Sequence, residues 1–164
     1  MTFTVVTIEE MKVGSEIYYI IGNIVKQEHL HITFAPAFSM SSSKLASFHS
    51  GLLLLSKKFP AFSMKPGAKD TFTIKDGGQV DVLRMSDYTG SAHRLHSQLS
   101  TLISAHGARY EIPQFTGENF SPHISLNNGH AGSKDFRISW LRISQYDKVK
   151  NRATYSSDKF LLQG

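Results

Sequence analysis

The sequence predicts an α+β domain built from two similar lobes. Each half of the chain combines one long amphipathic helical segment with strand-like runs, and one strand in each half carries a histidine flanked by apolar residues. The length of 164 residues suits a single domain with a substantial core. We therefore expect residues 1–164 to form one two-lobed domain, although no residue-level repeat is visible.

The first half of the chain is expected to form two strands and a helix. Ile17 to Lys26 is rich in β-branched and aromatic residues, and the polar pair Gln27-Glu28 separates it from a second strand, His29 to Phe34. Pro36 should end the regular pairing of that strand. Residues 41–59 are predicted to be helical, with serines as N-cap candidates. The apolar residues that recur at helical spacing there are Leu45, Phe48, Leu52, Leu55 and Phe59.

Two strand-like runs and a second helix follow. Residues 62–86 alternate strand patterns with expected turns at Pro66-Gly67 and Gly77-Gly78. Ser91 to Ala105 is predicted to be a helix, with Gly107 as its C-cap. One face of this helix carries Leu95, Leu99, Leu102 and Ile103, with His96 at its edge in a position to pack or cap.

The last third of the chain is expected to close the sheet. An irregular segment from Glu111 to Pro122 precedes a strand at His123 to Leu126. Two further strands are predicted over 136–145 and roughly 153–162.

Composition restricts the chemistry and the surroundings of the protein. The absence of cysteine excludes disulfides, thiolate zinc sites and a cysteine nucleophile. A formal charge of +5 mildly favours anionic partners such as nucleotides. The first residues carry acids rather than the lysines of a secretory signal, and the most apolar run, Leu52 to Leu55, is too short to span a bilayer. We expect a soluble, cytoplasmic, monomeric protein that does not bind membranes.

Two short strand motifs carry the candidate chemistry. In HLHITF, His29, His31 and Thr33 alternate with apolar residues, and in PHISL, His123 and Ser125 do the same. Side chains alternate across a strand, so each histidine and the hydroxyl two residues later share a face. Chance predicts about a quarter of an occurrence of such a flanked His-x-Ser/Thr pattern, and the sequence has two.

Paired imidazoles and hydroxyls suit the hydrolysis of a phosphodiester. The reaction requires removal of a proton from the attacking water and delivery of a proton to the leaving oxygen. Two imidazoles that titrate near neutrality can do both without a metal. The neighbouring hydroxyls can donate hydrogen bonds to the non-bridging phosphate oxygens.

The motifs LHITF and PHISL resemble the paired motifs of the two-histidine (2H) phosphoesterases, the superfamily of 2′-5′ RNA ligase-like proteins and cyclic phosphodiesterases. The segment LHSQLSTLISAHGA and the loop ending in NFSPHISL are similar to that family's helix–loop–second-motif unit. The closing segments FRISWLRISQYD and KFLLQ are similar to its final strand pair, so the resemblance covers most of the chain.

This resemblance implies a bilobal fold in which two antiparallel sheets form a central cleft and helices pack outside. It also implies a phosphoric diester hydrolase that acts on 2′,3′-cyclic phosphates or 2′-5′ linkages of RNA without a cofactor or metal. The substrate would be an RNA end or a cyclic (oligo)nucleotide. Carried over by position, His31 and His123 become the general acid/base pair, and Thr33 and Ser125 become the substrate-binding donors to the phosphate.

The sequence leaves several alternatives open. The second motif has Ser where Thr is commoner in the family. Only a tight turn fits between the strand at 17–26 and the first motif, where many family members have a helix. That compact start is similar to short bacteriophage members, which include hydrolases of cyclic oligonucleotide immune signals. A non-catalytic RNA- or nucleotide-binding module with the same cleft would share these motifs. His29-x-His31 also has the spacing of a metal-binding pair, but no third ligand is evident nearby.

Overall fold

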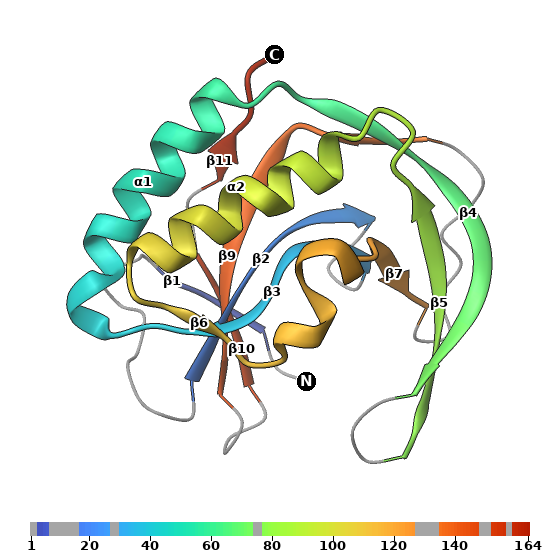
Figure 1. The fold of residues 1–164 in the computed structure, drawn as a ribbon, viewed down its shortest axis with the longest axis horizontal. Helices are drawn as coiled ribbons and strands as arrows, with labels where there is room; N and C mark the ends of the chain where they lie inside the picture. Colours follow the sequence, from blue (N-terminus) through green and yellow to red (C-terminus); the bar gives the residue numbers. More distant parts are fainter. Residues whose placement is uncertain are drawn as a thin grey trace.

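The computed structural model describes residues 3–6, 17–26, 30–73, 77–126, 135–147, 152–156 and 159–164. Two helices, α1 (Leu45–Lys58) and α2 (Ser91–Ala105), pack beside each other and against one large sheet (Figure 1). The α+β class predicted from the sequence is therefore confirmed. Neither helix is long and apolar enough to cross a membrane, and the same holds for the rest of the described chain.

The described residues form eleven strands that hydrogen-bond into a continuous sheet, with the order β1-β10-β9-β2-β3-β7-β5-β4-β8. Two short strands lie off this path, because β6 pairs with β3 and β11 pairs with β9. The strand bounds are Phe3–Val6 (β1), Ile17–Lys26 (β2), Leu30–Ser39 (β3), Phe62–Thr73 (β4), Gln79–Ser86 (β5), Arg109–Tyr110 (β6), His123–Ser125 (β7), Phe136–Ile138 (β8), Trp140–Asp147 (β9), Arg152–Ser156 (β10) and Phe160–Leu161 (β11).

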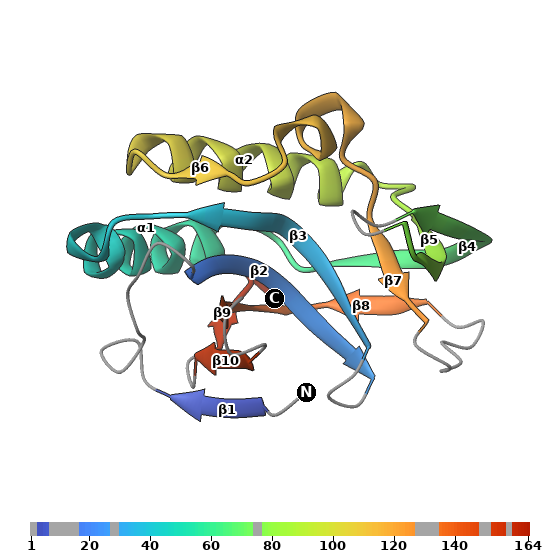
Figure 2. The ribbon, with the colours of Figure 1, turned by 90° about the horizontal axis from the view of Figure 1, so that it is seen from below.

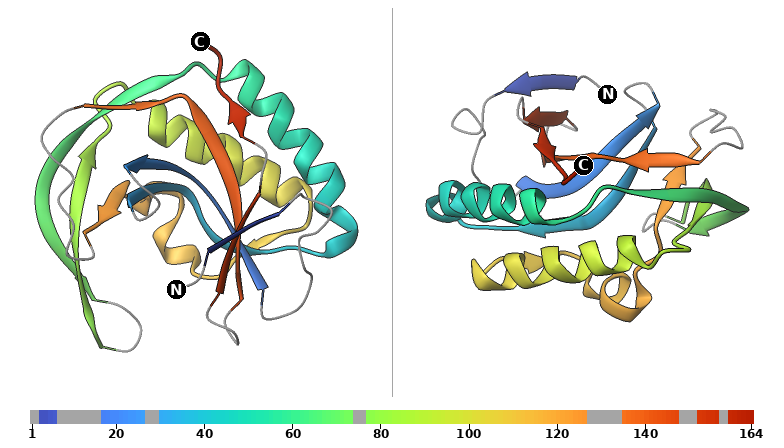
Figure 3. Two further views of the ribbon diagram at one scale, coloured as in Figure 1. Left: turned by 180° about the vertical axis from the view of Figure 1, so that it is seen from behind. Right: turned by 90° about the horizontal axis from the view of Figure 1, so that it is seen from above.

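The sheet has two halves that meet at β7. Strand β7 lies between β3 and β5, which joins the half that contains β2 and β9 to the half that contains β4 and β8 (Figure 2). Most neighbours are antiparallel, but β1 pairs with β10 in parallel. The long β4–β5 hairpin lies at one end of the molecule and α1 at the other (Figure 3). Pairing β3 with β7 satisfies backbone groups that two separate sheets would leave open at the centre.

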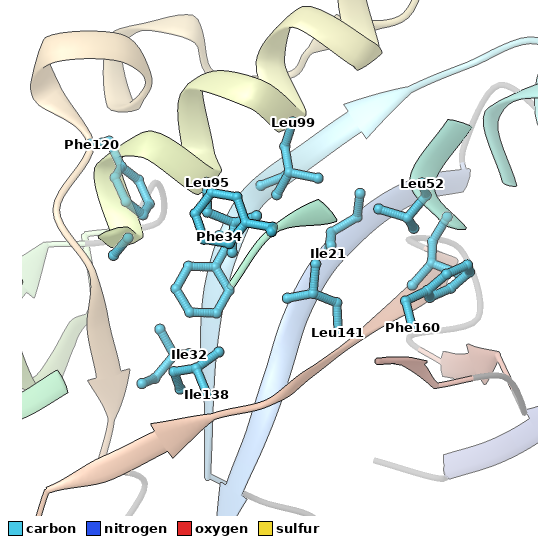
Figure 4. Packing of buried hydrophobic residues seen from close by; sticks show 14 of the residues in the cluster. Ile21, Ile32, Phe34, Leu52, Leu95, Leu99, Phe120, Ile138, Leu141 and Phe160 are labelled. Atoms are coloured by element: carbon cyan, nitrogen blue, oxygen red, sulfur yellow. The ribbon is translucent and has the colours of Figure 1, made fainter. Parts of the chain in front are cut away.

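Among the residues that the structure describes, one apolar cluster packs between the sheet and the helices. Ile32 and Phe34 of β3 contribute side chains that are fully buried, as do Leu95 and Leu99 of α2 (Figure 4). The opposite end of the cluster is completed by residues of β2, β9, β11 and α1, which are Ile21, Leu141, Phe160 and Leu52. Burial of this apolar surface is the main driving force that fixes the sheet against the helices.

Helix α2 ends as its sequence predicts. Gly107 has a φ of 67°, and its N–H donates to Ser104 O while the Ala108 N–H donates to Ile103 O. These two bonds form a Schellman motif, in which glycine tolerates the left-handed conformation. Helix α1 differs from expectation at its start, because Lys44 occupies the N-cap position without a side-chain hydrogen bond.

Two proline-based expectations were wrong. Pro36 lies inside β3 rather than at its end, and the predicted turn at Pro66-Gly67 lies inside β4. Pro36 lies at a register shift in β3, between the pairs Ile21–Ala35 and Tyr19–Phe38, and Pro66 is the last paired residue before the shift that ends at Lys69 in β4. A β-bulge leaves an extra residue outside the ladder, so a proline without an N–H is tolerated there.

Replacement of Gly22 by alanine should destabilise the junction between β2 and β3. A Cβ at this position would lie 2.5 Å from the Ile32 carbonyl oxygen, so the two backbones would have to separate. We expect Gly22→Ala to lower the free energy of unfolding by about 2 kcal/mol or more, measured by urea denaturation.

Gly107→Ala is the matched control, because the described residues leave open space around that position. Its cost should be confined to the left-handed backbone, roughly 1 kcal/mol. Equal stability of the two variants would contradict the close approach of β2 to β3.

Candidate active site

The two histidine motifs lie on neighbouring strands. β3 and β7 pair in antiparallel orientation, with Ile32 opposite Ile124. Both isoleucines are fully buried in the core cluster, so the flanking positions of each strand belong to the opposite face. On that face Thr33, His123 and Ser125 are half-buried.

The register pairs each histidine position with the hydroxyl of the other motif. Moving one residue from the Ile32–Ile124 pair in each direction of the antiparallel ladder puts Thr33 opposite His123 and His31 opposite Ser125. This statement concerns the backbone of His31, whose side chain lies outside the described residues, and His29 lies outside them altogether.

Strand β5 fixes the position of β7 from the other side. Arg84 lies opposite His123, and Val82 lies opposite Ser125. Hydrogen bonds extend the contact beyond both ends of the short strand, since Met85 N–H donates to Pro122 O and Leu126 N–H donates to Asp81 O. The three residues of β7 are therefore held in place by both neighbouring strands.

The His123 ring has a defined tautomer. Its Nδ1 lies 2.9 Å from the Ser121 carbonyl oxygen, which can only accept a hydrogen bond, so Nδ1 carries the proton. In the neutral ring the lone pair is then on Nε2, which is the atom available for proton transfer. The ring also packs against Phe72 of β4, with centroids 4.8 Å apart and the planes at 69°.

Arg84 contacts two residues that also contact the His123 ring, Ser121 and Phe72. Its Nη1 donates to Ser121 Oγ at 2.8 Å and its Nε donates to Asp70 Oδ2 at 2.7 Å. The guanidinium also lies over the Phe72 ring, with Cζ 5.0 Å from the centroid. The hydrogen bond from Arg84 and a second from the Thr71 N–H lower the pKa of Asp70, so this carboxylate stays charged at neutral pH.

His96 of α2 links strand β3 to the loop that precedes β7. Its Nδ1 donates to the carbonyl oxygen of Phe34, the residue after Thr33, at 2.8 Å, and its Nε2 accepts the Gly117 N–H at 2.9 Å. The ring is buried and stacks on Phe120 with centroids 4.1 Å apart. The loop, drawn between β6 and β7 in Figure 1, is thus attached to α2 at two points.

His93, one helical turn earlier, reinforces this attachment. Its Nε2 lies 3.1 Å from Phe120 O and its Nδ1 lies 2.6 Å from Asp87 Oδ2. Burial alone would raise the pKa of Asp87. The hydrogen bonds from the His93 ring and from the backbone N–H groups of Ala92 and His93 outweigh burial and hold this pKa below its ordinary value. Through these two backbone N–H groups, the Asp87 carboxylate also satisfies donors in the first turn of α2.

The described residues contain no group of three His, Asp or Glu side chains that could hold a metal ion. The metal hypothesis for His29 and His31 concerns side chains outside the described part of the chain, so it stays untested.

The sequence did not single out Arg84, Phe72 or Ser121 as site residues. Arg84 and Phe72 lie on runs that were recognised as strands, but alternation within a strand does not reveal which strand lies beside it. Ser121 carried no signal at all. His96 was expected to pack or cap, and the structure shows that it packs and also bonds to the loop.

Acidification should destabilise the protein through His96. Burial lowers the pKa of His96 below its ordinary value of 6.5, the bond to Phe34 O partly opposes this, and the nearby His93 adds to the lowering. The unfolded chain then takes up the proton first as the pH falls. The stability that neutral His96 contributes is complete above about pH 6.5 and is lost as the pH falls toward the folded-state pKa.

His96→Phe tests this dependence, because phenylalanine retains the stacking but does not titrate. We expect a loss of about 1–3 kcal/mol near neutrality from the two lost hydrogen bonds. We also expect a shallower decline of unfolding free energy below pH 6.5 than in the wild type, measured by denaturant titrations across pH. The same slope in both proteins would be inconsistent with a neutral, buried His96.

No family model matches the sequence, and no curated protein matches it significantly. Solved structures do match. The protein TT0787 of Thermus thermophilus has a TM-score of 0.61 and 16% identity over 90% of this chain and 98% of its own. E. coli LigT complexed with 3′-AMP has a TM-score of 0.58 and 14% identity over 91% and 98%. A structure described as a phosphoesterase has a TM-score of 0.57 and 13% identity over 91% and 98%.

These matches cover nearly the whole of both chains, so they concern the complete arrangement of strands and helices rather than one motif. Identities of this size carry information on the fold alone. The chain therefore has the fold of LigT and of the phosphoesterase that match it, which confirms the fold expected from the resemblance of its motifs.

Proposed function

We propose that this protein is a metal-independent phosphodiesterase that acts on 2′,3′-cyclic phosphate or 2′-5′-linked RNA-type substrates. The observation that carries the proposal is the antiparallel pairing of β3 and β7 at Ile32 and Ile124. This register brings two His-x-Ser/Thr motifs, distant in sequence, to adjacent positions on one face of the sheet.

His123 and His31 act as the general acid/base pair. In the hydrolysis of a 2′,3′-cyclic phosphate, one imidazole takes a proton from water as the water oxygen bonds to phosphorus. The bond from phosphorus to one ribose oxygen breaks, and the other imidazole gives that oxygen a proton. The tautomer of His123 supports this role, because the bond from Nδ1 to Ser121 O leaves Nε2 for proton transfer.

Thr33 and Ser125 bind the phosphate. Each hydroxyl is half-buried and lies across the ladder from the histidine position of the other motif. A donor on each side suits a phosphate whose charge increases as the water attacks. The match to LigT structures complexed with 3′-AMP and with phosphate supports a nucleotide phosphate as the ligand of this fold.

Loss of either motif histidine should strongly reduce turnover without loss of the fold. We expect His31→Ala and His123→Ala to reduce kcat by about 10²- to 10⁴-fold, since each removes one proton-transfer group. The assay uses excess EDTA and offers a 2′,3′-cyclic mononucleotide, a 2′-5′ dinucleotide and several cyclic oligonucleotides, so the preferred substrate class is measured at once.

His106→Ala is the matched control, because this histidine bonds to Ser47 and Leu102 O at the C-terminal end of α2. Near-normal turnover in either motif variant would contradict the two-histidine mechanism. Binding of these ligands without any turnover by the wild type would instead indicate a binding module.

Loss of either motif hydroxyl should affect the chemical step more than substrate affinity. We expect Thr33→Val and Ser125→Ala each to lower kcat by about 100-fold with little change in KM, because the donors matter most when charge develops on the phosphate. Steady-state kinetics with the preferred substrate measures this. An increase in KM alone would contradict this expectation, because it would show that the hydroxyls bind the ground state and the transition state equally.

A further inference from the structure

We propose that Arg84 is a positioning residue for His123. It holds two groups that contact the imidazole, Ser121 and Phe72, and thereby keeps the proton on Nδ1 and the lone pair on Nε2. The catalytic consequence of this inference rests on the proposed function, whereas its structural consequence does not.

The first contact passes through Ser121. Arg84 Nη1 donates to the hydroxyl of this residue at 2.8 Å, and the carbonyl oxygen of the same residue accepts the His123 Nδ1–H at 2.9 Å. Ser121 lies outside β7, two residues before His123, so its carbonyl direction is not set by the strand ladder. A bond to its side chain restrains the orientation of that carbonyl.

The second contact passes through Phe72. The guanidinium of Arg84 lies over the Phe72 ring, and that ring in turn meets the His123 ring at a centroid distance of 4.8 Å. A cation over an aromatic face is attractive and limits the freedom of the ring. The imidazole is therefore bounded by a hydrogen bond at Nδ1 and by an aromatic surface, and Arg84 contacts both.

Asp70 fixes Arg84 itself. Its carboxylate accepts the Nε–H at 2.7 Å and also accepts the N–H of Thr71. Arg84 thus uses two separate nitrogens of one planar group, Nε toward Asp70 and Nη1 toward Ser121, while its Cζ lies over the Phe72 ring. A lysine carries all of its N–H donors on one nitrogen at the end of a flexible side chain, so it cannot reproduce this arrangement.

The arrangement matters because a neutral imidazole has two tautomers. With the proton on Nδ1, Nε2 can accept a proton. With the proton on Nε2, that atom has no lone pair to act as a base. Arg84 lies directly opposite His123 in the ladder. Its side chain acts on this histidine through Ser121 and Phe72 and does not touch the reacting atoms.

The test is nuclear magnetic resonance of the histidine nitrogens in the full-length protein, without substrate. At a pH about two units above the ordinary histidine pKa, long-range ¹H–¹⁵N couplings show which nitrogen carries the proton. We expect His123 of the wild type to be almost entirely the Nδ1–H form and Arg84→Met to show a mixture of both tautomers. An unchanged tautomer in Arg84→Met overturns the proposal.

Arg94→Met is the matched control. Arg94 is also an exposed arginine with two hydrogen bonds, to Thr89 O and Ser91 Oγ, but neither partner contacts His123. It should leave the His123 tautomer unchanged. The Arg84 side chain is 45% exposed, so its replacement is compatible with folding. Arg84→Lys retains the charge and should also shift the tautomer, and full retention of the wild-type tautomer by lysine would overturn the role of the planar group.

Kinetics provides a second, separate readout. We expect Arg84→Met to lower kcat about twofold or more and to leave KM within about twofold, because Nε2 of His123 cannot accept a proton in the part of the molecules that has the other tautomer. A rise in KM with unchanged kcat would overturn the proposal in favour of direct phosphate binding by Arg84. If Arg84→Met shifts the tautomer but the wild type hydrolyses none of the substrates, the positioning role of Arg84 is supported and the proposed function is refuted.

Discussion

The pairing of β3 with β7 at Ile32 and Ile124 is the interaction on which the rest of the structure depends. Both side chains are buried in the core, so the pair joins the two halves of the sheet and anchors them in the same apolar cluster. The opposite face of the same two strands carries Thr33, His123 and Ser125. A shift of register by one residue would move every one of these side chains to the other face and destroy the core and the candidate site together.

Elements on either side of this pair keep it in register. On one side, two histidines of α2 hold the loop before β7, with His96 also bonded to the backbone of β3. On the other side, the β4–β5 hairpin pairs with β7 and carries the contacts of Arg84. β7 is only three residues long, so its position is determined by these neighbours rather than by its own length. This division separates residues that support the candidate site from the motif residues for which we propose a chemical role.

Local pattern was a good guide where one short-range rule decides the outcome. The leucine and isoleucine spacing of α2 and the glycine after it predicted the helix and its end, because both depend on contacts within a few residues. The same approach failed at Pro36 and Pro66, where a partner strand accommodates the proline through a bulge. It also gave no indication that Phe3–Val6 would pair in parallel with β10, a strand about 150 residues away in the chain.

The sequence by itself determined which motif side chains share a face, because alternation within a strand follows from backbone geometry and places His123 and Ser125 on the face opposite Ile124. It also determined the α+β class through the periods of its apolar residues. Only the tertiary structure decided that the two motif strands are neighbours, which tautomer His123 adopts, and that Arg84 and Phe72 lie beside it. The physical reason is that strand pairing and side-chain contacts across strands depend on the packing of the whole core, and no local pattern encodes which distant segment will supply the partner.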